Sequence, residues 1–292
     1  MTRSRRFIAL VAAIALWPLA ATQPALARAP VIVAAGDIAC GGDPCTPERR
    51  TARLVRSIGP RAVLALGDLQ YPDGSLEDFR SSYDRTWGRF KGRTFPTPGN
   101  HEYQTPHADG YFRYFGGRAH RAPHDGSYAF DLGRWHLLSI NTGDGRPNDS
   151  LLRWVRRDLR RDRSRCELAY WHHPLHSSGH EHGGDERARE LWGVLFRAGV
   201  DVVLNSHEHN YERFALLGPT GAPRRDGIRQ FVVGTGGGPL YGLPSDGDRG
   251  SQRRIDHRHG VLRMDLHRSG YEWRFLAVGR TTLDRGTQRC HR

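Results

Sequence analysis

The 292-residue sequence has no glycine period, no sustained heptad and, beyond its first residues, no apolar run of membrane-spanning length. These absences exclude a collagen-like chain and a coiled coil, and they argue against a permanent membrane anchor. No linker or internal repeat is visible. The chain does contain 37% hydrophobic and 10% aromatic residues, enough to bury a sizeable core. A wholly disordered chain is therefore excluded.

Lysine is almost absent, since Lys91 is the single lysine among 44 basic residues. Set against 31 acidic residues, the formal net charge is +13. No long block of like charges occurs, because arginines alternate with acids, as in Arg156–Asp158 and Arg160–Arg163. Such patterning is typical of solvated helix faces rather than of a nucleic-acid-binding patch. The positive field can still attract anionic substrates.

The N-terminus has the pattern of an export signal. Arginines at positions 3, 5 and 6 precede the apolar stretch Phe7–Ala21, and Ala25-Leu26-Ala27 supplies a small-x-small cleavage site. We predict a secretory signal peptide over residues 1–27 and a secreted, extracellular protein. The Ser4–Phe7 string faintly resembles a twin-arginine signal, which exports proteins already folded.

Export makes the four cysteines candidates for disulfides. Cys40 and Cys45 are five residues apart around a turn-forming segment, a spacing that suits a local bridge. Cys166 and Cys290 then pair by elimination. Metal ligation is the alternative, although the spacings match no zinc knuckle.

Short apolar runs followed by polar residues predict buried strands whose loops carry chemistry, the arrangement of an α/β sheet. These runs are Val31–Ala35, Ala62–Leu66, Thr94–Pro96, Leu168–Trp171 and Val200–Leu204. Helical spacing predicts helices over Thr46–Ile58, Ser75–Phe90, Asp149–Arg161 and Gly184–Arg197. Two hairpins are predicted, Ser127–Asp131 with Trp135–Ile140 and Val261–Leu266 with Tyr271–Val278. Residues 28–292 are therefore expected to form a single α/β catalytic domain.

Five strand-end loops present oxygen and nitrogen donors. They are Asp37, Asp68 with Tyr71, Asn100-His101-Glu102, His172-His173 and His207-x-His209. Any one of these loops is a weak signal, but together they offer about seven donors and no thiolate. Such a set suits hard or borderline ions such as iron, zinc and manganese. Seven donors with one shared carboxylate predict two metals, the arrangement that activates water for phosphoryl displacement.

These motifs resemble the calcineurin-like metallophosphoesterase superfamily, in order and roughly in spacing, from about Val31 to Val278. The resemblance implies a sandwich of two mixed β-sheets flanked by helices. Most members of that superfamily carry a histidine two residues after the first aspartate, where this chain has Ala39. In the purple acid phosphatase branch a tyrosine supplies the missing ligand, and here Tyr71 follows Gly67-Asp68 at the matching position. The absence of the histidine at position 39 and the presence of Tyr71 therefore agree, which favours the purple acid phosphatase type.

The resemblance implies two metal sites that share one carboxylate. The first site is expected to hold Fe(III) and uses Asp37, Tyr71 and His209. The second is expected to hold divalent iron, zinc or manganese and uses Asn100, His172 and His207. Asp68 is expected to bridge both. Donor chemistry agrees, because phenolate and carboxylate favour a hard trivalent ion, whereas imidazole and amide suit a softer divalent one.

The resemblance also implies groups around the metals. His101 is expected to face the substrate and to donate a proton to a phosphate oxygen or to the leaving group. His182 best matches a second substrate-side histidine, followed by His180. Glu102 is expected to orient a neighbouring histidine, and His173 to have a structural role.

Two features concern glycine: one position where the family's usual glycine is absent, and one glycine-rich run. Ser206 stands where the family usually has glycine, which is tolerated if the backbone there does not need positive φ. The run Gly234–Gly238 predicts a close backbone turn near the active site rather than a phosphate-binding loop, since Pro239 follows it.

The sequence therefore predicts a secreted binuclear phosphatase that hydrolyses phosphate monoesters through a metal-bound hydroxide. A phosphodiesterase or nucleotide hydrolase on the same centre is the alternative. A more distant alternative is a non-catalytic, basic extracellular binding module, which predicts ligand losses and clustered arginines. The expected partner is a small-molecule phosphate ester, without specific nucleic acid or a permanent membrane anchor, and the oligomeric state is left open.

Overall fold

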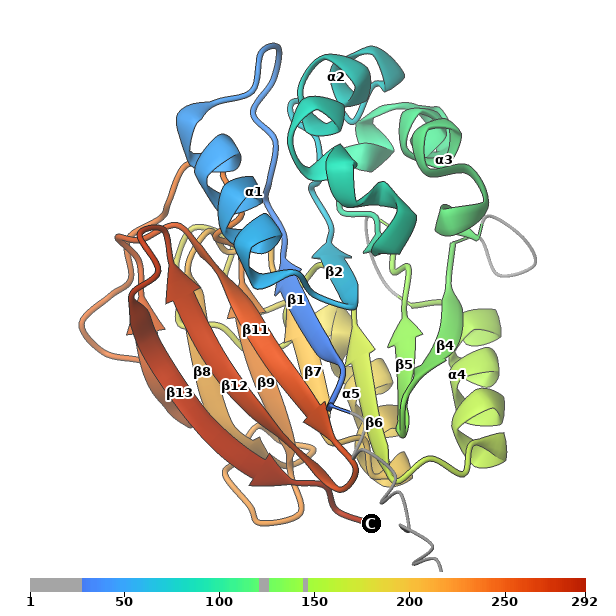
Figure 1. The fold of residues 1–292 in the computed structure, drawn as a ribbon. Helices are drawn as coiled ribbons and strands as arrows, with labels where there is room; N and C mark the ends of the chain where they lie inside the picture. The colour runs from blue at the N-terminus through green and yellow to red at the C-terminus, as the bar shows by residue number, and fades with distance from the viewer. Residues whose placement is uncertain (1–27, 121–125, 144–146) are drawn as a thin grey trace, which may run out of the picture.

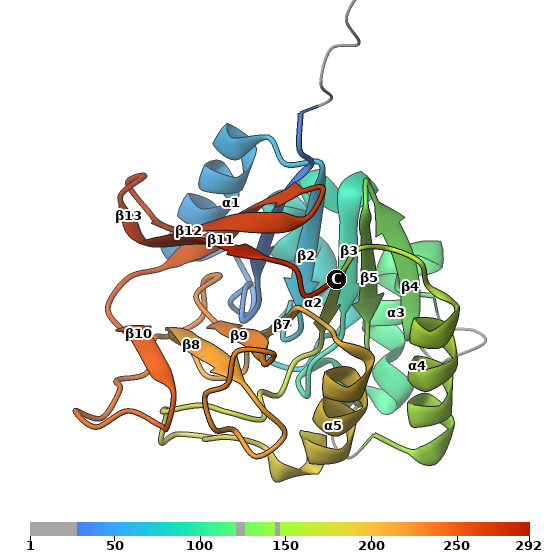
Figure 2. The same cartoon turned by 90° about the horizontal axis from the view of Figure 1, so that it is seen from below.

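Two β-sheets stacked face to face, with helices on their outer faces, build the protein (Figures 1 and 2). The computed structural model describes residues 28–120, 126–143 and 147–292. The predicted signal peptide, residues 1–27, lies outside the described residues. The predicted sandwich of two mixed sheets is confirmed.

The first sheet has six strands in the order β13-β12-β11-β1-β2-β3. Its strands are β1 (Val31–Ala35), β2 (Ala62–Leu66), β3 (Thr94–Thr97), β11 (Gly260–His267), β12 (Gly270–Ala277) and β13 (Thr282–Arg289). β1, β2 and β3 run parallel, whereas β11 pairs antiparallel with β1. Both strands of the predicted second hairpin, β11 and β12, are present.

The second sheet has seven strands in the order β10-β8-β9-β7-β6-β5-β4. They are β4 (Tyr128–Leu132), β5 (Trp135–Ser139), β6 (Cys166–Tyr170), β7 (Val202–Asn205), β8 (Tyr211–Leu217), β9 (Ile228–Val233) and β10 (Ser251–Ile255). β5, β6, β7 and β9 are parallel. The edge strand β10 and its neighbours β8 and β9 have no counterpart among the predicted strands.

The α-helices lie outside the two sheets: α1 on the side of the first sheet, α4 and α5 on the side of the second (Figure 2). They are α1 (Thr46–Ile58), α2 (Leu76–Ser81), α3 (Asp109–Phe115), α4 (Asp149–Arg161) and α5 (Arg189–Ala198). Short 3₁₀ helices are η1 (Tyr83–Arg85), η2 (Trp87–Arg93), η3 (Glu102–Gln104), η4 (Pro106–Ala108), η5 (Gly116–Ala119) and η6 (Glu186–Ala188). No helix among these described residues is long and apolar enough to cross a membrane.

One predicted helix is wrong as a continuous element. The segment expected as a helix over Ser75–Phe90 forms α2 and then turns into η1 and η2. Its side chains bond elsewhere, because the hydroxyls of Ser82 and Thr86 donate to the buried Glu48 carboxylate. Polar side chains that bond away from the helix compete with regular helical backbone. The helix predicted from Gly184 likewise begins later, at Arg189, after η6.

Both predicted disulfides are present, Cys40–Cys45 and Cys166–Cys290. The sulfur atoms are therefore occupied, and the alternative of metal ligation by thiolates does not hold. The second bridge links β6 to the segment after β13, so it ties the two sheets together across 124 residues of sequence. A partly buried hydrogen bond from Trp135 Nε1 to the His267 carbonyl (2.8 Å) adds a second link between the sheets.

A buried histidine sits between β5 and α4 with a carboxylate on each ring nitrogen. His136 Nδ1 lies 2.7 Å from Asp131 Oδ1, and His136 Nε2 lies 2.7 Å from Asp158 Oδ2. Burial alone lowers the pKa of His136, but the bonds to Asp158 and Asp131 outweigh it and raise the pKa to about 9. The ring is therefore an imidazolium that joins sheet to helix.

This imidazolium predicts a pH-dependent part of the stability. Because the folded pKa of about 9 exceeds the ordinary value of 6.5, the contribution is complete below pH 6.5 and is lost as pH rises through 9. His136→Gln should lower the unfolding free energy by on the order of 3 kcal/mol at pH 6 and by little above pH 9. Urea titrations across this range measure it, with exposed His267→Gln as control. A pH-independent difference would contradict the assignment.

Candidate metal centre

The predicted ligands follow strands from both sheets at one edge of the sandwich, the upper edge in Figure 1. Asp37 follows β1, Asp68 follows β2, Asn100 follows β3, His172 follows β6 and His207 follows β7. Carboxyl ends of parallel strands meet at the same edge, where α/β proteins place their sites. The two sheets contribute to one cluster because their inner faces are packed together.

Three of these loops hold non-glycine residues in the left-handed region. The φ angles are 56° for Asp37, 48° for Asp68 and 72° for His207. Such conformations cost about 1–3 kcal/mol each and persist only where neighbouring structure enforces them. Here backbone bonds enforce them, since Asp37 N–H donates to the Gly67 carbonyl (3.1 Å) and His207 N–H donates to Asp37 Oδ2 (3.0 Å).

Asp37, Tyr71 and His209 bring three ligand atoms together. The Tyr71 hydroxyl lies 3.1 Å from Asp37 Oδ1 and 2.9 Å from His209 Nε2, and the last two atoms are 3.3 Å apart. His209 Nδ1 faces the Pro239 carbonyl and donates to it, which leaves the Nε2 lone pair directed at the cluster. This is the tautomer that a metal-binding histidine needs.

Asp68, His172 and His207 form the adjoining half. His172 Nε2 lies 3.1 Å from Asp68 Oδ2 and 3.1 Å from His207 Nδ1. His172 Nδ1 faces the Leu66 carbonyl at 3.0 Å, so its Nε2 also points into the cluster. Asn100 Oδ1 is buried and has no hydrogen-bond partner within the described residues, and the next residue along the chain, His101, donates its N–H to Asp68 Oδ1.

These observations fit a pair of cations. Asp37 and Asp68 are buried carboxylates, and buried charges require a counter-charge. Burial raises and His172 lowers the pKa of Asp68, with a net decrease, whereas burial and the Asp37 carboxylate raise the pKa of Tyr71. A phenolate at Tyr71 therefore requires a bound cation. The orphaned Asn100 oxygen and the converging imidazole nitrogens are the remaining signs of metal ligands.

The comparisons with known proteins agree with this geometry. A family model described as calcineurin-like phosphoesterase matches residues 30–211, more than half of the chain. The chain belongs to the calcineurin-like phosphoesterase family.

Two curated purple acid phosphatases from Arabidopsis thaliana are similar to this member of the family. Purple acid phosphatase 21 is 28% identical over 253 residues, which cover 77% of this chain and 56% of the relative. Purple acid phosphatase 18 is 30% identical over 156 residues, 48% of this chain and 35% of the relative. The chain thus spans about a third to just over half the length of these relatives. The predicted resemblance to the purple acid phosphatase type is confirmed.

Solved structures show the same fold. A purple acid phosphatase from yellow lupin (Lupinus luteus) seeds superposes with a TM-score of 0.73 at 16% identity, over 89% of this chain and 53% of the lupin chain. A Plasmodium protein described as the anchor in the inner membrane complex gives 0.69 at 13% identity, over 91% and 90% of the two chains. Because a fold does not determine an activity, the residues of the site have to carry the functional argument.

His101 lies at the accessible side of the candidate metal centre. Its backbone N–H donates to Asp68 Oδ1 (2.9 Å), and its Nε2 lies 3.9 Å from Asp68 Oδ2. Its ring packs edge-on against Tyr71 with centroids 4.4 Å apart, and its side chain keeps 28% exposure. This position beside the ligands, open to solvent, is compatible with a substrate-facing histidine.

The structure separates the two further histidine candidates. His182 is exposed and stacks on His207, with ring centroids 4.2 Å apart. Its backbone N–H donates to Glu208 Oε1 (2.7 Å), so the residue between His207 and His209 anchors the loop that carries His182. His180 is exposed, and among the described residues no ring contact or ion pair joins it to the centre.

His173 lies closer to the centre than its predicted structural role required. Its buried ring packs against His172 and His207, with centroids 4.8 and 4.4 Å away. Burial and the neighbouring His172 lower the pKa of His173 to about 3, so its ring is neutral. His172, His173 and His207 form a group whose ligand atoms all lie within 4.8 Å of one another, which makes His173 a third imidazole at this half of the cluster.

The sequence reasoning missed Tyr241. Its ring stacks almost parallel on His209, with centroids 4.1 Å apart and an interplanar angle of 8°, and its N–H donates to the His209 carbonyl (3.1 Å). The available signal was an aromatic residue shortly after the predicted turn Gly234–Gly238. That turn is close to the site, since Gly238 N–H donates to the Asp37 carbonyl (2.8 Å).

Two close approaches explain the small residues around the ligands. A Cβ on Gly67 would come within 2.5 Å of His172 Nδ1, and Gly67 has a φ of +92°, so glycine is required there. Ser206 does not have positive φ, in agreement with the expectation for this departure. Its hydroxyl donates to the Leu66 carbonyl (2.6 Å), the same oxygen that faces His172.

The predicted role of Glu102 is wrong. Its buried carboxylate accepts hydrogen bonds from four backbone amides instead of from a histidine. The donors and distances are Asp68 N (2.9 Å), Leu69 N (2.8 Å), Gln70 N (3.2 Å) and Gly99 N (2.7 Å). The loop after β2 is thereby strapped to the loop after β3, which fixes Asp68 relative to Asn100.

Glu102→Gln should therefore loosen the metal centre, because an amide replaces one of the two accepting oxygens by a donor. We expect metal affinity to fall by about 10–100-fold, the effect typical of groups that support ligands. Metal content after dialysis against graded chelator measures it, with exposed Glu190→Gln as control and circular dichroism as a check of the fold. Unchanged retention of both metals would show that the strap is dispensable.

Proposed function

We propose that this phosphoesterase is an exported, purple acid phosphatase-like enzyme that hydrolyses phosphate monoesters at a dinuclear metal centre. The observation that carries the proposal is the convergence of Tyr71 with Asp37 and His209. Tyr71 occupies the place left by Ala39, where most of the superfamily has a histidine ligand. The exported location rests on the signal pattern of residues 1–27 and on the two disulfides, which persist in oxidising compartments.

The proposed metal assignment follows the two halves of the cluster. Asp37, Tyr71 and His209 would hold Fe(III); Asn100, His172 and His207 would hold a divalent iron, zinc or manganese ion; Asp68 would bridge them. When bound, the two ions would lower the pKa of a water and stabilise the charge of an in-line phosphoryl displacement. His173 is the additional nitrogen donor available to the divalent half.

The protein's own groups would then handle substrate and proton. His101 Nδ1 faces the Pro72 carbonyl, which orients the ring and leaves Nε2 on the side of Asp68. In its protonated form His101 donates from Nε2 to a phosphate oxygen or to the leaving-group oxygen. His182, stacked on His207, is proposed as a second histidine on the substrate side, ahead of His180.

The first test is the ratio of initial hydrolysis rates for an aryl phosphate monoester and the matching diester, with the protein loaded with iron and zinc. A large preference for the monoester at acidic to neutral pH is expected. A preference for the diester would move the enzyme to the phosphodiesterase class on the same centre. No hydrolysis of either ester with both metals bound would contradict the proposal for simple phosphate esters.

Asp68→Asn should impair both metal sites at once, since it removes the charge of the bridging carboxylate. Turnover should fall by more than about 100-fold, which is the loss typical of groups that only support a ligand. The content of both metals should also fall, while the fold stays intact. Elemental analysis and initial rates measure the two effects, with exposed Asp226→Asn as control. An active variant with two metals would remove Asp68 from the bridging position.

Tyr71→Phe should abolish the visible absorption of a phenolate-to-iron charge transfer, because the phenolate oxygen is the proposed donor to Fe(III). Tyr241→Phe is the matched control, since Tyr241 stacks on His209 but, unlike Tyr71, has no hydrogen bond to Asp37 among the described residues. Absorption spectra of the iron-loaded proteins separate the two tyrosines. Colour that survives in Tyr71→Phe would exclude this tyrosine as the ligand.

A further inference from the structure

A second charged feature lies away from the metal ligands, between α1 and the η1–η2 segment. It is a cavity of about 200 Å³ whose lining includes five arginines. They are Arg49, Arg53, Arg56, Arg85 and Arg89. The arginines that are dispersed in the sequence therefore gather in space at this cavity.

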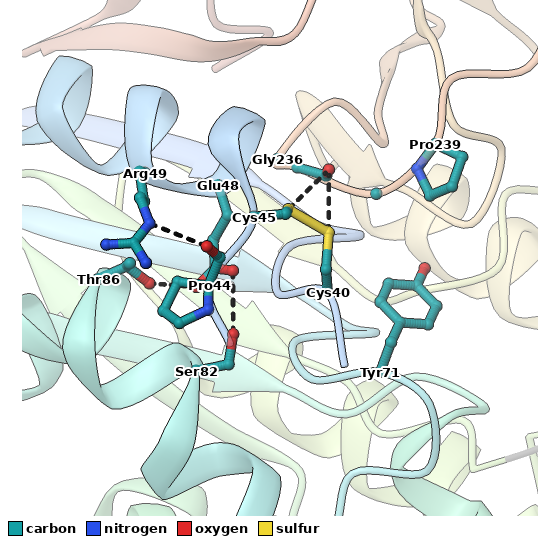
Figure 3. The surroundings of a disulfide bond; sticks show 12 residues. Cys40, Pro44, Cys45, Glu48, Arg49, Tyr71, Ser82, Thr86, Gly236 and Pro239 are labelled. Atoms are coloured by element: carbon teal, nitrogen blue, oxygen red, sulfur yellow. Dashed lines mark hydrogen bonds between the residues drawn. A yellow bond between two sulfur atoms is a disulfide. The ribbon is translucent and has the colours of Figure 1, made fainter. Parts of the chain in front are cut away.

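Helical spacing and buried hydrogen bonds bring these side chains together. Arg49, Arg53 and Arg56 lie on one face of α1, because residues three and four apart are neighbours on a helix. The opposite wall is held against α1 by the buried Glu48, whose carboxylate accepts from Ser82 (3.1 Å) and Thr86, as Figure 3 shows. The cavity is consequently built into the packing and does not need a ligand to form.

The charges of this cavity are poorly neutralised. Asp43 pairs with Arg85 at 3.1 Å, and both side chains are exposed, at 85% and 60%. Within the described residues no carboxylate is paired with the other four arginines. Arg49 Nε donates to the Pro44 carbonyl (2.9 Å) and Arg89 Nε to the Arg85 carbonyl (3.1 Å), so their charge stays uncompensated.

Another arginine-lined cavity provides a contrast. It lies between α4 and α5, and its lining also has five arginines but includes a carboxylate, Asp162. The arginines are Arg156, Arg160, Arg163, Arg197 and Arg292. Arg156 pairs with Glu190 (3.0 Å) and Arg292 pairs with Glu167 (3.0 Å), so carboxylates already balance part of its charge. Like charges that surround a cavity without such partners repel one another, and a multivalent anion relieves that repulsion.

Size and chemistry narrow the class of anion. Guanidinium groups match phosphate oxygens with paired hydrogen bonds, which makes arginine a preferred phosphate ligand. The volume equals roughly seven waters at about 30 Å³ each, enough for a short chain of phosphate groups. Phe90, the aromatic residue in the lining, is only 3% exposed and offers no platform on which a nucleobase could stack.

We propose that the cavity between α1 and the η1–η2 segment binds short inorganic polyphosphate chains at a site separate from the metal centre. The site adjoins the loop closed by Cys40–Cys45, since Arg49 and Arg85 contact Pro44 and Asp43 of that loop. Figure 3 shows Arg49 and Tyr71 on opposite sides of the disulfide. Occupation of the cavity therefore does not require occupation of the metal centre.

Isothermal titration with sodium tripolyphosphate at constant ionic strength tests the proposal, in an Asp68→Asn background that suppresses turnover. Arg53→Gln/Arg56→Gln is compared with Arg153→Gln/Arg157→Gln, whose arginines are also exposed on a helix, α4, but do not line the cavity. Both pairs remove the same charge. We expect at least a tenfold weaker affinity for the cavity pair and less than a twofold change for the control pair, with orthophosphate binding more weakly than tripolyphosphate.

If both pairs of substitutions weakened the affinity for tripolyphosphate equally, the effect would be one of net charge and the proposed site would be overturned. Absence of binding before any arginine is changed would also overturn it. Tighter, cavity-dependent binding of a single-stranded oligonucleotide would overturn the ligand class. Unfolding midpoints of all variants establish that each one is folded. Because the readout is binding, failure of the proposed phosphatase activity would leave this inference standing, and its own failure would leave the activity untouched.

Discussion

The buried carboxylate of Asp37 joins the two sheets at the edge where the metal centre lies. Its Oδ2 accepts from His207 N–H, which follows β7 of the second sheet, and its Oδ1 accepts from the Tyr71 hydroxyl, which follows β2 of the first. Asp37 is fully buried, so these partners are part of the charge compensation that a buried carboxylate needs. Sheet packing and ligand geometry are thus a single constraint, since displacing one sheet would separate the ligands.

This constraint also explains why strain collects at the centre. Asp37, Asp68 and His207 hold left-handed backbone conformations that a side chain makes costly. Hydrogen bonds from glycine-rich neighbours maintain them, such as Gly236 N–H to the Gly36 carbonyl (3.0 Å). The strain aims carboxylate and imidazole groups at one point, where two cations would repay the cost of burying them. The rigid backbone at this edge therefore preorganises the donor atoms for metal binding.

The gathering of the proposed ligands at one edge was predictable, because they follow the carboxyl ends of β1, β2, β3, β6 and β7, and all five strands are short apolar runs in the sequence. Strand periodicity places such ends at one edge, so no tertiary detail was needed. Glu102 was given the wrong partner and Tyr241 was missed, because the residues that each one contacts are remote in the sequence. The amides that Glu102 accepts from lie mostly some thirty residues earlier, and the stacking of Tyr241 on His209 depends on the path of the loop after β9.

The same kind of remote contact explains both the interruption of the helix predicted over Ser75–Phe90 and the position of the arginine-lined cavity. Glu48 is 34 residues from Ser82 and 38 from Thr86, and its buried carboxylate draws both hydroxyls away from helical geometry. The chain between them turns into η1 and η2, which places Arg85 and Arg89 opposite the exposed face of α1. Had the segment continued as one helix, these two side chains would follow the rotation of that helix instead. One buried carboxylate thus interrupts a locally favoured helix and sets the wall of a cationic cavity, just as Asp37 sets the geometry of the metal centre.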